Sequence, residues 1–299
     1  MPSGLERTTG RRDSLRLAIR LVVYAVLAYF SLLLVGWALL GLGRVLGAVS
    51  TVLAAACLVN WVSLRIYEHL SLLDLGLMWN HSSSYNLGLG VGAGIIAACL
   101  VLAPPLALGF AHMVGTPAEQ PSFGATVFVT VMLAAGAVGE ELLFRGYGFQ
   151  IMLADLGPFA TILPVSVLFA LLHGANPNSN WYGIANTAAF GVVFGYAYVR
   201  SRDLWLPIGL HFGWNLTLPL FGVNLSGLRM NVTGSEMSWT AGVLWSGGAY
   251  GPEAGLPASV VVVLLLVFLW KAPVRQQFSP LTSPRAENAV CEPSPPLPS

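Results

Sequence analysis

The chain has 299 residues, of which 56% are hydrophobic and only 9% are charged, with a formal net charge of +1. Soluble globular proteins usually have about a quarter of their residues charged, so this composition excludes a soluble enzyme. The near-zero net charge gives no sign of nucleic-acid binding. A mean hydropathy of +0.72 indicates an integral membrane protein with several spans.

Apolar windows predict about eight membrane-spanning helices packed as an all-α bundle. A helix needs about 20 mostly apolar residues to cross the hydrocarbon core of a bilayer. The expected spans are residues 17–40, 45–66, 87–113, 125–154, 158–174, 182–200, 204–222 and 257–270. We therefore expect one transmembrane domain over residues 17–274, with the chemistry-bearing motifs between residues 123 and 222.

Arginines at the start of the chain predict that its N-terminus lies in the cytoplasm, since positive residues gather on that side of a membrane. The first span is too long for a removable signal peptide, so residues 1–16 are expected to be a basic cytoplasmic segment. An even number of spans returns the C-terminus to the same side. Residues 275–299 are rich in Pro and Ser and are expected to form a disordered tail.

Two adjacent acids and an arginine lie in the fourth expected span, where each ionised group costs about 2.5 to 3.5 kcal/mol. Glu141 and Arg145 are four residues apart, which places them on one helix face as a salt bridge. Glu140 faces roughly 100° away and has no local cation. The sequence therefore predicts a structural role for the Glu141 and Arg145 pair and a chemical role for Glu140.

A histidine on the fifth expected span is predicted to reach Glu140. The Gly157-Pro158 pair is typical of a helix stop, so the fourth and fifth spans should form an antiparallel hairpin around it. Glu140 precedes Gly157 by seventeen residues and His173 follows it by sixteen. At about 1.5 Å per residue, both side chains lie roughly 24 to 26 Å from the turn and thus at the same depth.

His211 and Asn215 share one face of the seventh expected span, because they are four residues apart. Such a pair can donate hydrogen bonds to a developing oxyanion, or it can clamp two helices together. Counted from the turn at Asp203, His211 lies only about 12 Å into its helix. This count predicts that His211 is shallower than His173.

The ordered set Glu140-Glu141-x-x-x-Arg145, Phe169-x-x-x-His173 and His211-x-x-x-Asn215 resembles the CPBP family. That family comprises type II CAAX prenyl endopeptidases and bacteriocin-processing and immunity proteins, and is also called Abi. The resemblance implies an intramembrane endopeptidase on a helical bundle. It implies that Glu140 and His173 activate the attacking water and that His211 and Asn215 stabilise the oxyanion. Glu141, Arg145 and Phe169 would support the site.

No cofactor is favoured, although Glu140, His173 and His211 offer a three-ligand set for a divalent ion such as zinc. The chain lacks the His-Glu-x-x-His motif of many zinc proteases, so a metal-independent mechanism is preferred. Expected partners are membrane lipids and a peptide or protein substrate, lipidated or not, with no nucleic acid. The expected location is a prokaryotic plasma membrane.

Two other functions use the same buried polar residues. One is a non-catalytic membrane protein, such as a bacteriocin-immunity protein or a scaffold, which the intact motifs disfavour. The other is a transporter or channel with an ion or proton pathway. The sequence has no internal repeat of the kind on which many secondary transporters are built, and this disfavours the second alternative.

Overall fold

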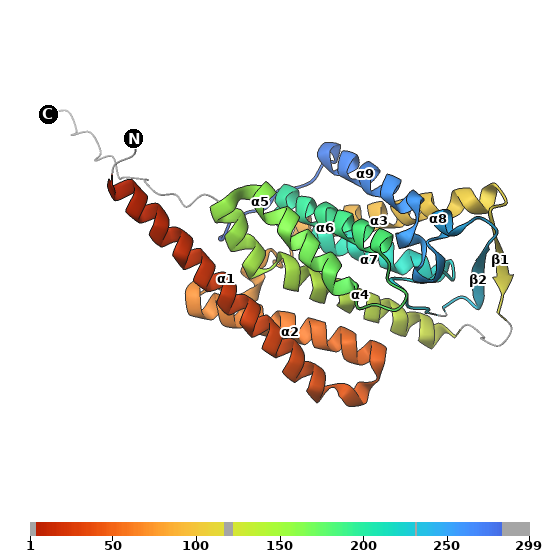
Figure 1. Cartoon of the computed structure of the whole chain (residues 1–299), viewed down its shortest axis with the longest axis horizontal. Coiled ribbons are helices and arrows are strands. Elements are labelled where there is room, and N and C mark those ends of the chain that lie inside the picture. The colour runs from red at the N-terminus through yellow and green to blue at the C-terminus, as the bar shows by residue number, and fades with distance from the viewer. Residues whose placement is uncertain (1–3, 117–121, 231, 283–299) are drawn as a thin grey trace.

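The computed structural model describes residues 4–116, 122–230 and 232–282, with side chains from residue 13 onward. The described chain is mostly helical (Figure 1). The long helices are α1 (Gly4–Ala38), α2 (Arg44–Tyr67), α3 (His81–Ala107), α4 (Phe123–Arg145), α5 (Tyr147–His173), α6 (Trp181–Ser201), α7 (Trp205–Leu220) and α9 (Leu256–Lys271). The shorter elements are α8 (Val243–Ser246), the strands β1 (Ala111–Gly115) and β2 (Ser235–Trp239), and four 3₁₀ turns at Leu40–Leu42, Leu72–Leu75, Gly248–Tyr250 and Pro252–Ala254.

Four helical stretches are long and apolar enough to cross a membrane, and they point to an integral membrane protein. They are Asp13–Ala38, Arg44–Tyr67, His81–Ala107 and Phe123–His173, the last of which covers both α4 and α5. Helices α6, α7 and α9 occupy the places of the last three expected spans, but none of them is among these four. Helices α7 and α9 have only 16 residues each. The expected number of about eight spans is therefore not confirmed.

The fourth and fifth expected spans are joined through two breaks in the helix instead of the single predicted turn. Helix α4 ends at Arg145 instead of continuing to residue 154, and α5 bends at Gly157, whose φ is +80°. The first break follows from a buried side chain of α2. Asn60 Nδ2 donates to the Leu142 carbonyl at 2.9 Å, and Asn60 Oδ1 accepts the Tyr147 N–H at 2.6 Å. Asn60 thus satisfies backbone groups that a continuous helix would have paired internally.

Helices α3 and α7 pack with their backbones in contact because glycines face each other. A Cβ on Gly90 would lie 2.5 Å from the Leu206 carbonyl oxygen, and one on Gly209 would lie 2.5 Å from the Leu87 carbonyl oxygen. A Cβ on Gly213 would overlap the carbonyl oxygen of Val91. Small residues at a helix interface permit this approach, which is common in membrane proteins. The contact fixes the position of α7 in the bundle.

Two strands, absent from the all-α prediction, lie at the end of the molecule remote from the start of α1 (Figure 1). β1 pairs antiparallel with β2, from Ala111 opposite Trp239 to Gly115 opposite Ser235. The expected third span ended at residue 113, inside β1, whereas α3 ends at Ala107. Apolar residues beyond Ala107 belong to a strand whose hydrogen bonds come from the distant β2, which hydropathy alone does not reveal.

Residues 275–282, expected to begin a disordered tail, instead pack against the helices. The Arg275 N–H donates to Asn86 Oδ1 at 3.1 Å, and Gln277 Nε2 donates to Asp203 Oδ2 at 2.5 Å. Arg202 also donates to the carbonyl of Thr282. Polar groups in this segment find buried partners, and composition alone cannot anticipate them. The rest of the expected tail, residues 283–299, lies outside the described residues.

Candidate active site

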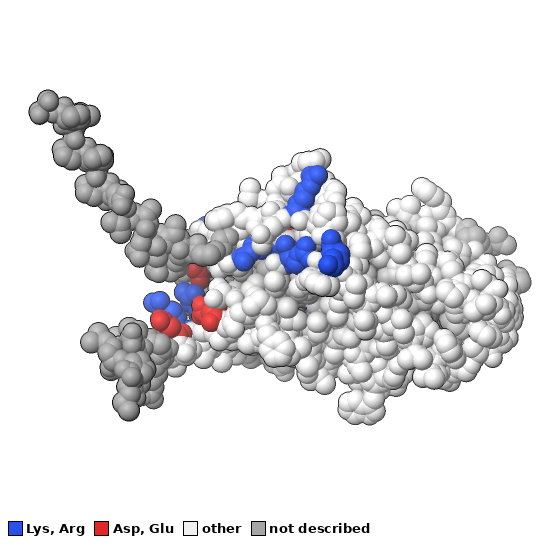
Figure 2. All heavy atoms as spheres, turned by 90° about the horizontal axis from the view of Figure 1, so that it is seen from above, with Lys and Arg blue, Asp and Glu red and all other residues white. Residues whose placement is uncertain are grey.

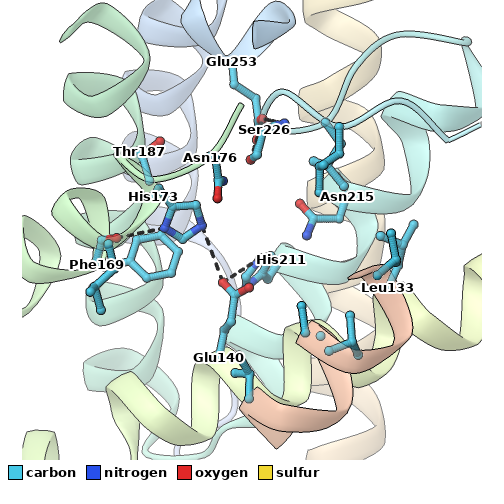
Figure 3. A pocket seen from close by; sticks show the side chains of 18 of the residues that line it. Leu133, Glu140, Phe169, His173, Asn176, Thr187, His211, Asn215, Ser226 and Glu253 are labelled. Atoms are coloured by element: carbon cyan, nitrogen blue, oxygen red, sulfur yellow. Dashed lines mark hydrogen bonds and ion pairs between the residues drawn. The ribbon is translucent and has the colours of Figure 1, made fainter. Parts of the chain in front are cut away.

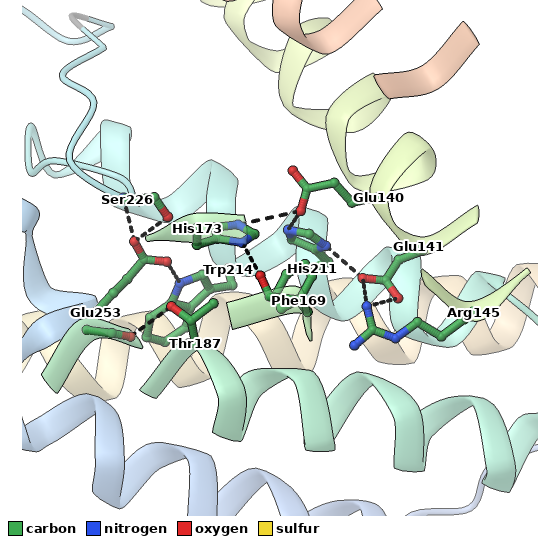
Figure 4. A network of polar contacts seen from close by, with 11 residues as sticks. Glu140, Glu141, Arg145, Phe169, His173, Thr187, His211, Trp214, Ser226 and Glu253 are labelled. Atoms are coloured by element: carbon green, nitrogen blue, oxygen red, sulfur yellow. Dashed lines mark hydrogen bonds and ion pairs between the residues drawn. The ribbon is translucent and has the colours of Figure 1, made fainter. Parts of the chain in front are cut away.

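Three side chains from three helices converge in the interior of the bundle (Figure 4). Glu140 Oε2 lies 3.8 Å from His173 Nε2 and 3.8 Å from His211 Nε2. Glu140 comes from α4, His173 is the last residue of α5, and His211 lies in the middle of α7. The equal depth expected for Glu140 and His173 is therefore observed, even though the turn between their helices has a different form.

His173 is held by its own helix. Its Nδ1 lies 2.8 Å from the carbonyl oxygen of Phe169, which can only accept a hydrogen bond. Nδ1 therefore carries the proton, and Nε2, which faces Glu140, presents a lone pair when the ring is neutral. The Phe169 ring also packs 4.4 Å from the His173 ring. Phe169 thus supports the histidine through both its backbone and its side chain.

The structure places His211 beside Glu140, so the prediction of a shallower His211 is wrong. The count from Asp203 treated the helices as upright and starting at one level, whereas α7 packs with its backbone against α3 and carries His211 to Glu140. His211 Nδ1 lies 2.8 Å from Glu141 Oε1, which leaves Nε2 directed toward Glu140. Its ring stacks on Phe194 with centroids 4.8 Å apart and planes inclined by 13°.

Glu141 and Arg145 form the expected ion pair along α4. Arg145 Nη1 lies 3.3 Å from Glu141 Oε2, and both side chains are at most 1% exposed. The guanidinium also donates to the Gly191 carbonyl at 2.9 Å and lies 5.1 Å from the Phe169 ring. Glu141 therefore joins two groups, since its Oε1 both accepts from Arg145 Nη1 at 3.4 Å and contacts His211 Nδ1 at 2.8 Å.

Glu140 differs from its neighbour in its surroundings. Its side chain is 28% exposed, yet Oε2 is buried and has no hydrogen-bond partner among the described residues. When both imidazoles are neutral, their bare Nε2 atoms face this same oxygen. Three acceptors directed at one place favour a group that carries protons or positive charge there. A water molecule or a cation would satisfy them.

The same three side chains are the set that could hold a divalent ion. Each histidine has its Nδ1 on an oxygen, the second-sphere arrangement that orients many metal-binding histidines. However, no group of three His, Cys, Asp or Glu side chains in the described part of the chain is arranged closely enough to hold a metal. Glu140 Oε2 is 3.8 Å from each histidine Nε2, a separation that one shared water molecule can bridge.

A pocket of about 560 Å³ contains this cluster (Figure 3). Its polar residues are Arg44, Glu140, His173, Asn176, Thr187, His211, Asn215, Ser226 and Glu253. Asn215 directs its carboxamide into the pocket, on the same face of α7 as His211. The opposite wall is apolar and is formed by α2 and α4, with Val45, Val49, Val52 and Leu133 among its residues. The pocket can thus hold a chain with one polar and one apolar side.

Sequence reasoning missed Glu253, the acid at the far end of the pocket. Glu253 Oε1 accepts from Trp214 Nε1 at 3.1 Å, and Oε2 accepts from the N–H and the hydroxyl of Ser226 at 2.5 and 2.9 Å. Glu253 therefore connects the loop after α7 to Trp214, the residue before Asn215. The available signal was an isolated acid directly before the apolar run of α9. Asn176, which follows α5, also lines the pocket.

Comparison with known proteins identifies one related family. Residues 122–217 match the Rce1-like family, described as type II CAAX prenyl endopeptidase Rce1-like. No curated protein and no solved structure matches the chain. The Rce1-like match covers α4 to α7 and includes Glu140, His173 and His211. It supports a membrane endopeptidase of the CAAX type, and it does not extend to the bacteriocin-processing or Abi branches.

Proposed function

We propose that the protein is an intramembrane endopeptidase that hydrolyses a peptide bond of a membrane-associated or lipidated substrate. The observation that carries this proposal is the position of Glu140 Oε2, which is 3.8 Å from the Nε2 atoms of both His173 and His211. A carboxylate and an imidazole at this spacing can share one water molecule and remove its proton. The match to the Rce1-like family supports the same reaction class.

In the proposed reaction, the water oxygen bonds to the scissile carbonyl carbon as Glu140, assisted by His173, accepts the water proton. The carbonyl oxygen becomes an oxyanion. When the C–N bond breaks, Glu140 returns the proton to the leaving amine, so the carboxylate is regenerated. The reaction consumes one water and yields two peptide ends. Because Glu140 is partly exposed to the pocket, water and the substrate carbonyl can both reach it.

The oxyanion would bind at His211 and Asn215. His211 Nδ1 is directed at Glu141, so Nε2 can donate to an oxyanion only when the ring is an imidazolium. The Glu141 carboxylate, 2.8 Å away, stabilises that charged form. Asn215 adds a neutral donor from the same helix face. Arg145 in turn pairs with Glu141 in a fully buried position and balances the charge of its carboxylate.

We propose that this mechanism needs no metal ion, because a carboxylate general base activates water through hydrogen bonds alone. If a divalent ion were bound, Glu140, His173 and His211 would hold it, and it would polarise the water and the carbonyl. A non-catalytic scaffold would not need an acid directed at two histidines.

The direct test uses purified protein in lipid vesicles with a library of membrane-anchored peptides, analysed by mass spectrometry for new termini. We expect cleavage by the native protein and none by Glu140→Gln. A variant with a change outside the pocket, Glu236→Gln, should cleave at the native rate, since Glu236 lies on β2, pairs with Arg229 and does not line the pocket. Proton or ion flux without cleavage would favour the transporter alternative.

A further inference from the structure

Basic residues gather at one end of the molecule. Ten Lys and Arg residues have described side chains, and seven of them lie near the end where α1 begins, where α2 and α6 finish and where α9 finishes. They are Arg16, Arg20, Arg65, Arg200, Arg202, Lys271 and Arg275. Figure 2 shows that Lys and Arg on this face avoid the opposite end. We call these seven residues the basic end.

Contacts across helices show that the basic end is one surface. Arg20 on α1 pairs with Glu68, directly after α2, at 2.7 Å. Arg200 on α6 donates to carbonyls in and after the last turn of α9, including that of Trp270 at 2.8 Å. Arg275 is joined through its N–H to Asn86 in the early part of α3. Five helix ends are therefore linked to this surface.

The opposite end carries few charges. Arg44, the first residue of α2, and Arg229, in the loop after α7, are its basic residues among the described side chains, and Arg229 is paired with Glu236 at 2.6 Å. The tenth residue, Arg145, is buried beside Glu141. Lys and Arg are concentrated on the cytoplasmic side of membrane proteins. Seven of these side chains lie at the basic end and two at the opposite end, which assigns the basic end to the cytoplasm.

The pocket opens at the end remote from these charges. Its lining includes Arg44 at the start of α2, the loop residues Ala175 to Pro177 after α5, and Ser226 to Met230 after α7. None of the seven residues of the basic end lines it. These lining segments adjoin the start of α2 and the ends of α5 and α7. The opposite ends of these three helices lie toward the basic end (Figure 1).

Buried structure separates the site from the basic end. Below Glu140, the Glu141 and Arg145 pair is completely enclosed, and the hydrophobic cluster beyond it includes Leu142, Tyr147 and Tyr198, which are at most 1% exposed. A peptide cannot cross this layer without dismantling it. The pocket therefore lies on the other side of this layer from the basic end, where the loop residues after α5 and α7 line it.

We propose that the pocket opens on the non-cytoplasmic side of the membrane and receives its substrate there. The substrate is then a polypeptide segment exposed at the outer surface, such as part of an exported or membrane-anchored protein. A lipidated C-terminus displayed in the cytoplasm would face the closed side of the site. This inference about substrate rests on the proposed endopeptidase function, whereas the direction of the opening does not.

The test is cysteine labelling in intact cells, which does not depend on activity. In a background with Cys57, Cys99 and Cys291 replaced by Ala, one variant carries Ala175→Cys at the pocket mouth. A matched variant carries Ser84→Cys near the basic end. Both positions are accessible at the surface of the described chain. A membrane-impermeant maleimide should label Ala175→Cys in intact cells and Ser84→Cys only after the cells are permeabilised.

The reverse pattern would overturn the proposal. If Ala175→Cys is unreactive even in permeabilised cells, Met113→Cys on β1, also exposed at that end, replaces it and decides the question in the same way. The labelling is repeated with Glu140→Gln present. The same pattern in a variant without activity separates the direction of the opening from the proposed chemistry, so either idea can fail without the other.

Discussion

His211 bridges the two adjacent acids of α4: its Nδ1 is 2.8 Å from Glu141 Oε1, and its Nε2 is 3.8 Å from Glu140 Oε2. One imidazole therefore connects an enclosed carboxylate, which is paired with Arg145, to a carboxylate that faces the pocket. Because the two acids have different surroundings, the same substitution in each should have different effects. The first two predictions use this difference.

Glu140→Gln should abolish peptide cleavage while the protein still folds. The amide keeps the shape of the side chain but cannot accept a proton from water. Since Glu140 has no buried hydrogen bond to lose at Oε2, the melting temperature in detergent should stay close to that of the native protein. Cleavage assays and a thermal melt on the same preparation check both parts. A melting temperature lowered as much as in Glu141→Gln would argue against a catalytic Glu140.

Glu141→Gln should instead reduce the yield of folded protein. Removing one partner of a buried ion pair leaves Arg145 uncompensated and costs about 3 to 5 kcal/mol. Replacing both partners, as Glu141→Leu with Arg145→Met, should recover much of that stability, because no buried charge remains. Cleavage should stay low in the double variant, since His211 has lost the carboxylate at Nδ1. Recovery of full activity there would show that Glu141 does not act through His211.

His211→Ala should lower turnover by roughly 10² to 10³, the scale expected when one oxyanion donor is lost. Asn215→Ala should lower kcat by a similar order with little change in KM, because the carboxamide would act on the developing charge. Steady-state kinetics on a single peptide would measure both. As a control, His112→Ala changes a histidine of β1 that does not line the pocket and should leave kcat unchanged. An Asn215→Ala variant that alters only KM would instead place Asn215 in substrate binding.

Activity should survive removal of divalent ions. The proposed water needs hydrogen-bond distances of about 2.6 to 3.2 Å from Glu140 and His173, whereas a zinc site needs three ligands within about 2.0 to 2.2 Å of one ion. Protein dialysed against a chelator is assayed beside an untreated sample, and metal content is measured by mass spectrometry. Stoichiometric zinc, with activity lost on chelation and restored by added metal, would reassign His211 as a ligand.

Gly213→Ala should separate α3 from α7 and disturb the site from behind. The new Cβ would overlap the Val91 carbonyl, and overpacking of this kind costs about 1 to 3 kcal/mol. Gly92→Ala is the matched control, since a Cβ there has open space and Ala favours a helix over Gly by roughly 0.5 to 1 kcal/mol. Thermal melts should move in opposite directions. Equal melting temperatures would mean that the two helices can shift apart without cost.

The local part of the site was predictable from sequence. Charges in an apolar window are costly, and four-residue spacing alone distinguishes Glu141 from Glu140. The depth of His173 also followed from counting residues around a turn. These inferences succeed because they use only positions on one helix or on two helices joined directly.

Contacts between distant segments were not predictable. Asn60 ends α4 from another helix, and the packing of α7 against α3 brings His211 beside Glu140, which a count along α7 does not reveal. Glu253 enters the pocket only because the chain after α7 folds back over it. Each of these depends on tertiary packing, which hydropathy and spacing do not encode.

Asn60 also limits how the pocket can change its width. It fastens α2 to the end of α4, while Gly139, beside Glu140, lets the backbones of α2 and α4 touch, since a Cβ there would lie 2.9 Å from the Leu53 N. The apolar wall and the general base therefore move as one rigid piece. A bulky substrate must then gain room on the other side, at the loop after α5 that follows His173. Selection among substrates by size would thus be decided next to the histidine that shares the attacking water.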